Sequence, residues 1–188
     1  MKASENCYKI IRGFETLHDG DLSLIGLQPK MCPAGIWTEG YGHAIIYNGK
    51  PLRGEENKEL AYKLSQVKTE DDAEALLKKD VEFFERGVNK LLKIRVNQNQ
   101  FDSLVSFAFN VGLNNFENST LLKKIKAGDF KGSADEFLKW NKSGAKVLPG
   151  LTRRRQAEKS LFETPVHDIW IAEEHIQPKG FEILRGVK

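Results

Sequence analysis

The sequence predicts an α+β protein with a small antiparallel sheet lobe and a larger helical lobe, joined by a long helix. A segment rich in glycine and proline, residues 27–50, forbids a long helix and suits short strands. The segments on either side of it place apolar residues at helical spacing. At 188 residues the chain is long enough to bury one substantial core.

The first helix is expected to begin after Ser4, whose hydroxyl can cap it. Apolar residues follow at helical spacing up to Phe14, and Gly13 marks the approaching end. Glu15 therefore stands at the C-terminal end of the helix. There the helix dipole and apolar neighbours favour the protonated carboxyl group, the form that a general acid requires. Taken alone, an exposed loop glutamate is the simpler interpretation.

Residues 27–50 are expected to form the sheet. Asn48 followed by glycine, directly after three apolar residues, is a strong signal for a hairpin with a tight turn. The same segment gathers a thiol, a hydroxyl and an imidazole from Cys32, Thr38 and His43.

The remainder of the chain is predicted to be helical. Thr69 and Asp72 resemble a capping box that opens a long amphipathic helix, which is expected to join the two lobes. A denser apolar segment around Phe101 indicates a buried central helix that Gly112 ends. Later helices are expected from Ser119 to Gly128, around residues 137–140, and from Arg153 to Phe162 with Thr152 as the cap.

Composition excludes several classes of protein. No apolar run approaches the ~18 residues of a membrane span, and the N-terminus lacks the pattern of a signal peptide. Cys7 and Cys32 are too few for a disulfide framework, although a single bridge between them stays open. No spacing resembles a zinc or iron–sulfur site, so no metal or cofactor is expected. A net charge of +3 suits an anionic partner, such as a bacterial wall or a nucleic acid, without choosing between them.

Cys32, Thr38 and His43 allow two chemistries. Thiolate attack assisted by imidazole would give a Cys–His hydrolase, although no third group that orients the imidazole is evident. Alternatively, the thiol and the hydroxyl hold a water opposite a protonated Glu15, which is the layout of an inverting glycosidase. For each residue alone, a structural role is the simpler interpretation.

The chain resembles the phage-type lysozymes, the endolysins of glycoside hydrolase family 24. The family pattern is a Glu on the first helix, then an Asp or Cys, then a Thr after five intervening residues. Cys32-x5-Thr38 matches the second half, and the flanking Pro-Ala-Gly-Ile-Trp-Thr-Glu-Gly-Tyr-Gly-His is specific to the family. Residues 99–112, 119–122 and 148–158 are similar to later elements of the family.

This resemblance implies a lysozyme-like α+β fold. It implies hydrolysis of the β-1,4 bond between N-acetylmuramic acid and N-acetylglucosamine of bacterial peptidoglycan during host-cell lysis. Glu15 would donate a proton to the leaving oxygen, while Cys32 and Thr38 position the attacking water in a single displacement.

Two structural pairings also follow from the resemblance. Arg154 would face Glu15 across the cleft, with the arginines on either side of it as alternatives. His43 would pair with Asp80 of the long helix, as a tie between the lobes and not as a catalytic group.

The resemblance also implies an organisation and a location. Residues 1–162 would form the catalytic domain, with the sheet lobe over about 15–65 and the helical lobe over about 70–162 together with the first helix. Residues 163–188 would be a C-terminal extension of unknown role. The protein is expected to be a monomer that binds peptidoglycan, not nucleic acid, without stable membrane insertion. Made in the host cytoplasm without a signal peptide, it would act on the wall after release through the inner membrane.

The chain departs from the family pattern in one place. Sixteen residues separate Glu15 from Cys32, more than the family usually has. A longer loop that leaves both ends in place explains this most simply, and the intact spacing to Thr38 favours Cys32. Asp19 or Asp21 in the extra segment would be the alternative second carboxylate.

Two other functional classes stay open. A peptidase or amidase acting on the peptide stems of the wall would use Cys32 and His43. A non-catalytic protein that binds peptidoglycan with the same fold would use neither.

Overall fold

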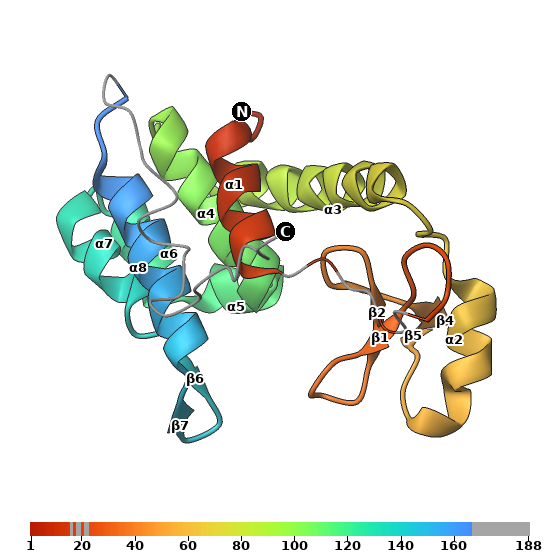
Figure 1. Ribbon diagram of the computed structural model, residues 1–188. Helices are drawn as coiled ribbons and strands as arrows, with labels where there is room; N and C mark the ends of the chain where they lie inside the picture. Colours follow the sequence, from red (N-terminus) through yellow and green to blue (C-terminus); the bar gives the residue numbers. More distant parts are fainter. Residues whose placement is uncertain (16, 18–19, 21–22, 167–188) are drawn as a thin grey trace, which may run out of the picture.

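The computed structural model describes residues 1–15, 17, 20 and 23–166. A small lobe of short strands and a larger helical lobe are joined by the long helix α3 (Glu70–Leu91), as Figure 1 shows. The small lobe holds β1 (Lys30–Met31), β2 (Trp37–Glu39), β3 (His43–Ala44), β4 (Ile46–Tyr47), β5 (Lys50–Pro51), the 3-10 helix η1 (Glu55–Asn57) and α2 (Lys58–Leu64). The helical lobe holds α1 (Glu5–Phe14), α4 (Gln98–Val111), α5 (Leu113–Asn118), α6 (Thr120–Lys126), α7 (Phe130–Phe137), β6 (Lys142–Ser143), β7 (Lys146–Val147) and α8 (Pro149–Glu163). The predicted α+β architecture is confirmed.

The small lobe contains a three-stranded antiparallel sheet in the order β1-β2-β3, with β4 and β5 as a separate hairpin. The hairpin turns at Asn48 and Gly49 with positive φ angles of 49° and 76°, so the predicted tight turn is confirmed. Trp37 and Ile45 pack in a small apolar core with two further buried residues, Leu52 and Ala61. Ala61 lies on α2, a short helix in the part of the chain predicted to be helical, for which the sequence analysis gave no bounds.

Helix α1 is anchored on the central helix α4 through its first residues. Ser4 caps α1 as predicted, accepting from the backbone N–H of Asn6. Its own N–H donates to Asp102 Oδ1 of α4 at 2.9 Å, and its hydroxyl donates to Oδ2 of the same carboxylate. Burial raises the pKa of Asp102, while the bonds from Ser4 oppose this shift. This contact fixes one end of α1, and Glu15 follows the other end.

The predicted start of α3 and the predicted end of α4 are confirmed. Thr69 and Asp72 form a capping box at the start of α3. Helix α4 ends at Gly112, whose φ of 86° favours glycine. Most of α4 is buried, and Phe107 contacts the rings of Phe116, Phe137 and Trp140 edge-on.

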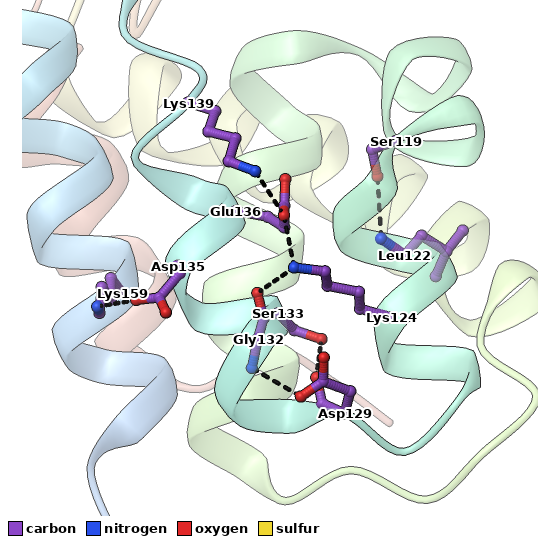
Figure 2. A network of polar contacts seen from close by, with 10 residues as sticks. All are labelled: Ser119, Leu122, Lys124, Asp129, Gly132, Ser133, Asp135, Glu136, Lys139 and Lys159. Atoms are coloured by element: carbon purple, nitrogen blue, oxygen red, sulfur yellow. Dashed lines mark hydrogen bonds and ion pairs between the residues drawn. The ribbon is translucent and has the colours of Figure 1, made fainter.

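Polar contacts join helices α6, α7 and α8 (Figure 2). The buried carboxylate of Glu136 accepts from Lys124 Nζ at 2.7 Å and from Lys139 Nζ at 2.8 Å. These hydrogen bonds, first the one from Lys124, hold the pKa of Glu136 below its usual range. Lys159 of α8 donates to Asp135 of α7 at 2.5 Å. The network holds α8 against the neighbouring helices, and α8 carries three consecutive arginines, 153–155.

Three expectations for the C-terminal part of the helical lobe are wrong in detail. Helix α8 begins at Pro149 and not after Thr152, because proline is tolerated in the first turn of a helix. Thr152 lies inside the helix, where its N–H and hydroxyl both donate to the carbonyl of Leu148. Trp140 lies beyond the end of α7 and not inside a helix. The hairpin of β6 and β7, which lies between Trp140 and α8 in the sequence, was not expected.

Side-chain contacts tie α3 to both lobes. His43 of β3 lies with Nδ1 at 2.9 and 3.0 Å from the two carboxylate oxygens of Asp80. This hydrogen bond raises the pKa of His43, and partial burial opposes it. Arg12 of α1 donates to both oxygens of Glu74, at 2.8 and 2.9 Å. An ion pair therefore ties each lobe to α3.

We predict that His43→Asn lowers the melting temperature more at mildly acidic pH than at high pH. The folded pKa of His43 is raised, so the pair stabilises the fold fully below the unfolded pKa of ~6.5, provided Asp80 is ionised. That contribution is lost as pH rises through the higher folded value. Both side chains are partly exposed, so we expect about 1 kcal/mol at most. Thermal unfolding of both proteins between pH 5 and 9 tests this, and a pH-independent difference would contradict it.

Candidate active site

Glu15 lies at the end of α1, facing both lobes. As the C-cap residue of the helix, it donates its N–H to the carbonyl of Ile11 at 2.8 Å. Its side chain is 23% exposed, and Oε1 accepts from Arg154 Nη1 of α8. The structure thus brings together the two residues that sequence reasoning placed across the cleft from each other. Arg153 and Arg155, the neighbouring alternatives, do not contact Glu15.

Arg154 is itself held by a buried network. Its Nε lies 3.2 Å from Oε1 of Glu158, a fully buried carboxylate one turn further along α8. The same oxygen accepts from the hydroxyl of Ser106 on α4 at 2.8 Å. Arg154 Nη2 donates to the Ser106 carbonyl at 3.4 Å. The guanidinium can therefore reach Glu15 in only one orientation.

Arg155 completes the base of this network. Its Nε lies 3.2 Å from Glu158 Oε2, and its Nη2 donates to Asn110 Oδ1 at 2.7 Å. Its guanidinium stacks over the ring of Phe107 at 4.9 Å. Burial lowers the pKa of Arg155 to about 10, with Glu158 opposing the shift. The positive charges of Arg154 and Arg155 are thus balanced by the negative charges of Glu158 and Glu15.

The sheet lobe reaches Glu15 through the turn between β2 and β3. Gly42 in this turn has a φ of 86°, and a Cβ added there would lie 3.3 Å from Glu15 Oε2. A side chain at this position would be strained and would crowd the carboxylate. The glycine therefore allows the backbone of the sheet lobe to approach Glu15 closely.

Cys32 and Thr38 lie on adjoining segments of the sheet lobe. Cys32 opens a tight turn, in which its N–H donates to the carbonyl of Ile36 and its carbonyl accepts from Gly35, both at 2.8 Å. Thr38 is buried in the central strand β2, and its hydroxyl donates to the carbonyl of Lys30 at 2.9 Å. The backbone of the sheet thus fixes the position of the Thr38 hydroxyl.

The remaining candidate residues divide into three groups. Cys7 and Cys32 are both free thiols, so no bridge joins them. Burial raises the pKa of Cys7. His43 is paired with Asp80 and, in the part of the chain that the structure describes, shares no hydrogen bond with Cys32. Asp19 and Asp21 lie outside the described residues.

A hollow of about 600 Å³ opens beside Glu15, here called the Glu15 hollow. It is lined by Gly13, Phe14, Glu15, Asn110, Leu148, Pro149, Gly150, Leu151, Arg153 and Arg154. Sequence reasoning missed its far wall at the start of α8, because the expected helix began too late. It also missed Glu158, although the spacing of four residues from Arg154 was a signal for an ion pair on one helix face.

Comparison with known proteins agrees with this architecture. The family model described as phage lysozyme matches residues 25–158. The endolysin of Bacillus phage B103 is 58% identical over 164 residues, which cover 87% of this chain and 55% of that protein. The chain therefore spans about half the length of this relative. The endolysin of Acyrthosiphon pisum secondary endosymbiont phage 1 is 38% identical over 170 residues, covering 87% of this chain and 99% of that protein.

Solved structures give the same fold. The muramidase domain of SpmX from Asticaccaulis excentricus superposes with a TM-score of 0.67 at 33% identity, covering 87% of this chain and 99% of that chain. An endolysin from Escherichia coli O157:H7 phage FAHEc1 also gives 0.67 at 33% identity, covering 87% and 94%. The predicted lysozyme-like fold is confirmed, and the chain belongs to the phage lysozyme family.

Proposed function

We propose that this protein is a muramidase that hydrolyses the β-1,4 bond between N-acetylmuramic acid and N-acetylglucosamine in bacterial peptidoglycan. One observation carries the proposal: the carboxyl group of Glu15 is fixed by Arg154 at the wall of a hollow of the helical lobe, where the turn of the sheet lobe at Gly42 approaches it. Relatives named endolysin and a structural relative named as a muramidase domain support the assignment.

In the proposed reaction Glu15 acts as the general acid. It gives its proton to the leaving glycosidic oxygen as the glycosidic bond breaks, while Cys32 and Thr38 hold the water that attacks the same carbon from the opposite side. The water passes its proton to solvent, and the attack inverts the configuration. The adjacent Arg154 holds the Glu15 carboxyl in position at the wall of the hollow. A half-buried thiol suits the task of orienting a water better than that of removing its proton.

We also propose that the protein serves host-cell lysis as a monomer, with peptidoglycan and not nucleic acid as its partner. Its route would begin in the host cytoplasm and continue through the inner membrane to the wall. Relatives named SAR-endolysin, 35% identical over 127 residues, support a lytic role. Within the described residues, no helix has the length and apolar character needed to cross a membrane.

Glu15→Gln is expected to lower the rate of hydrolysis by on the order of a hundred- to ten-thousand-fold, because the proton donor is lost. The amide oxygen still accepts a hydrogen bond from Arg154, so the fold should remain. The measurement is mass analysis and reducing-end release from purified peptidoglycan, with the exposed Glu117→Gln on α5 as the matched control. More than about a tenth of wild-type activity would place the acid elsewhere.

Cys32→Asp should keep substantial activity, whereas Cys32→Ala should lose more. A carboxylate can hold the attacking water and take its proton, but a methyl group can do neither. A thiolate nucleophile predicts the reverse, because aspartate cannot replace it in a Cys–His peptidase. Reducing ends and free amines released from the same digest separate the two reactions, and equal inactivation by both substitutions would count against Cys32.

Arg154→Met should lower kcat by about tenfold or more and change KM less, because the guanidinium holds the Glu15 carboxyl in one position at the wall of the hollow. Stability should fall by about 3–5 kcal/mol, because Glu158 loses one of its two buried arginine partners. Arg154→Lys is the charge-conserving control, and kcat is measured on purified peptidoglycan. An unchanged kcat in folded Arg154→Met would remove Arg154 from the site.

A further inference from the structure

Arg153 is the charged residue of the Glu15 hollow that the proposed reaction does not use. Its side chain is half-buried, its Nε is buried without a hydrogen-bond partner, and it forms no ion pair with any described residue. Buried donors and charges are nearly always paired. The part of the guanidinium that lines the hollow is therefore a cation without a counter-charge among the described residues, which points to an anionic ligand.

The charge balance around the hollow indicates the sign of that ligand. Arg154 is offset by Glu15 and Glu158, and Arg155 shares Glu158. These four groups sum to zero, so Arg153 is an excess positive charge at the hollow. A ligand that carries a negative charge fits this balance.

Asn110 adds a second donor to the hollow. Its Oδ1 accepts from Arg155 Nη2 at 2.7 Å, and a guanidinium can only donate, which fixes the orientation of the amide. The Nδ2 group of Asn110, which is exposed, is thereby left as a donor. With Arg153 it presents N–H groups beside an apolar wall formed by Phe14, Leu148 and Leu151. A carboxylate attached to a small apolar group matches this donor set and this wall.

We propose that Arg153 binds a carboxylate carried by the N-acetylmuramic acid unit of the substrate, with Asn110 as the second donor. This inference rests on the proposed function. The two sugar rings are uncharged, and in a unit that bears a peptide stem the lactyl carboxyl is bound as an amide. The charge therefore comes from a carboxylate of the stem or, in a unit without a stem, from the free lactyl carboxylate. The contact would make Arg153 a specificity-determining residue that holds the muramic acid unit in register with Glu15.

Arg153→Met provides the test, because it removes the guanidinium and keeps an apolar stem. On purified peptidoglycan, KM is expected to rise about tenfold while kcat changes less than about twofold, as for a lost charged hydrogen bond. The matched control is Arg86→Met, which removes an exposed arginine of α3 that has no partner among the described residues. An equal rise in KM for Arg86→Met would overturn the proposal, since it would reflect net charge alone.

Modified walls identify the ligand group. When the carboxylates are converted to amides with carbodiimide, wild type should fall to the level of Arg153→Met, and the variant should hardly change. If an amidase first removes the stems, each cleavage frees a lactyl carboxylate. The effect of Arg153→Met should then vanish if Arg153 binds a stem carboxylate, and should be present if it binds the freed lactyl carboxylate; either outcome supports the proposal. An effect of equal size on amidated and untreated walls would overturn it.

Two measurements keep this test separate from that of the proposed function. Release of muramic acid reducing ends by wild type is established first, so a failed Arg153 prediction leaves the muramidase assignment standing. Thermal unfolding of Arg153→Met is expected to match wild type, because Arg153 forms no hydrogen bond or ion pair with any residue that the structure describes. Arg153→Gln, which keeps a donor but no charge, serves as the second variant and should also raise KM.

Discussion

The buried ion-pair network beneath Glu15 is the constraint on which the rest of the structure depends. A charge taken out of water is costly unless it is paired and hydrogen-bonded, and Glu158 is fully buried between two arginines. Its partners come from two helices, because Ser106 lies on α4 and Arg154 on α8. A shift of α8 against α4 would break the hydrogen bonds that Ser106 and Asn110 make to this network. The position of Glu15 at the end of α1 follows from the same requirement, since Arg154 has one orientation in which all its contacts are made.

The part of the sheet lobe that approaches this network at Glu15 is the backbone of a turn, at Gly42. Gly42 brings the turn between β2 and β3 against Glu15, and the neighbouring residues of that turn secure it. Glu39 is buried, and one of its oxygens accepts from the Ser65 hydroxyl and from the N–H groups of Gln66 and Val67 in the linker before α3. His43 contacts α3 itself. The turn that approaches the acid is thus fixed on both sides by ionisable side chains that take no part in the proposed reaction.

The three consecutive arginines of α8 show how one helix serves stability and recognition together. Successive residues of a helix point in directions about 100° apart, so adjacent arginines reach different surroundings. Arg155 is buried against Phe107, Arg154 faces Glu15, and Arg153 lines the Glu15 hollow. The first two are neutralised by carboxylates and the third is not. The charge that remains is the feature from which the recognition of a carboxylate on the substrate is inferred.

By itself the sequence determined the elements whose signals are local. Ser4 as a cap, the capping box of Thr69 and Asp72, the turn at Asn48 and the stop at Gly112 each depend on the conformations open to a few adjacent residues. The family pattern added the candidates Glu15, Cys32 and Thr38, whose roles in the reaction stay predictions.

Only the tertiary structure decided which arginine faces Glu15 and that Glu158 and Ser106 hold it. It alone also decided that Arg153 has no partner among the residues that the structure describes. Pairing between residues as far apart in sequence as 15 and 154 depends on how helices pack, and three adjacent arginines carry the same local signal. Burial and pairing distinguish a charge with a structural role from one available to a ligand. Both are properties of the packed molecule and not of any short segment of the chain.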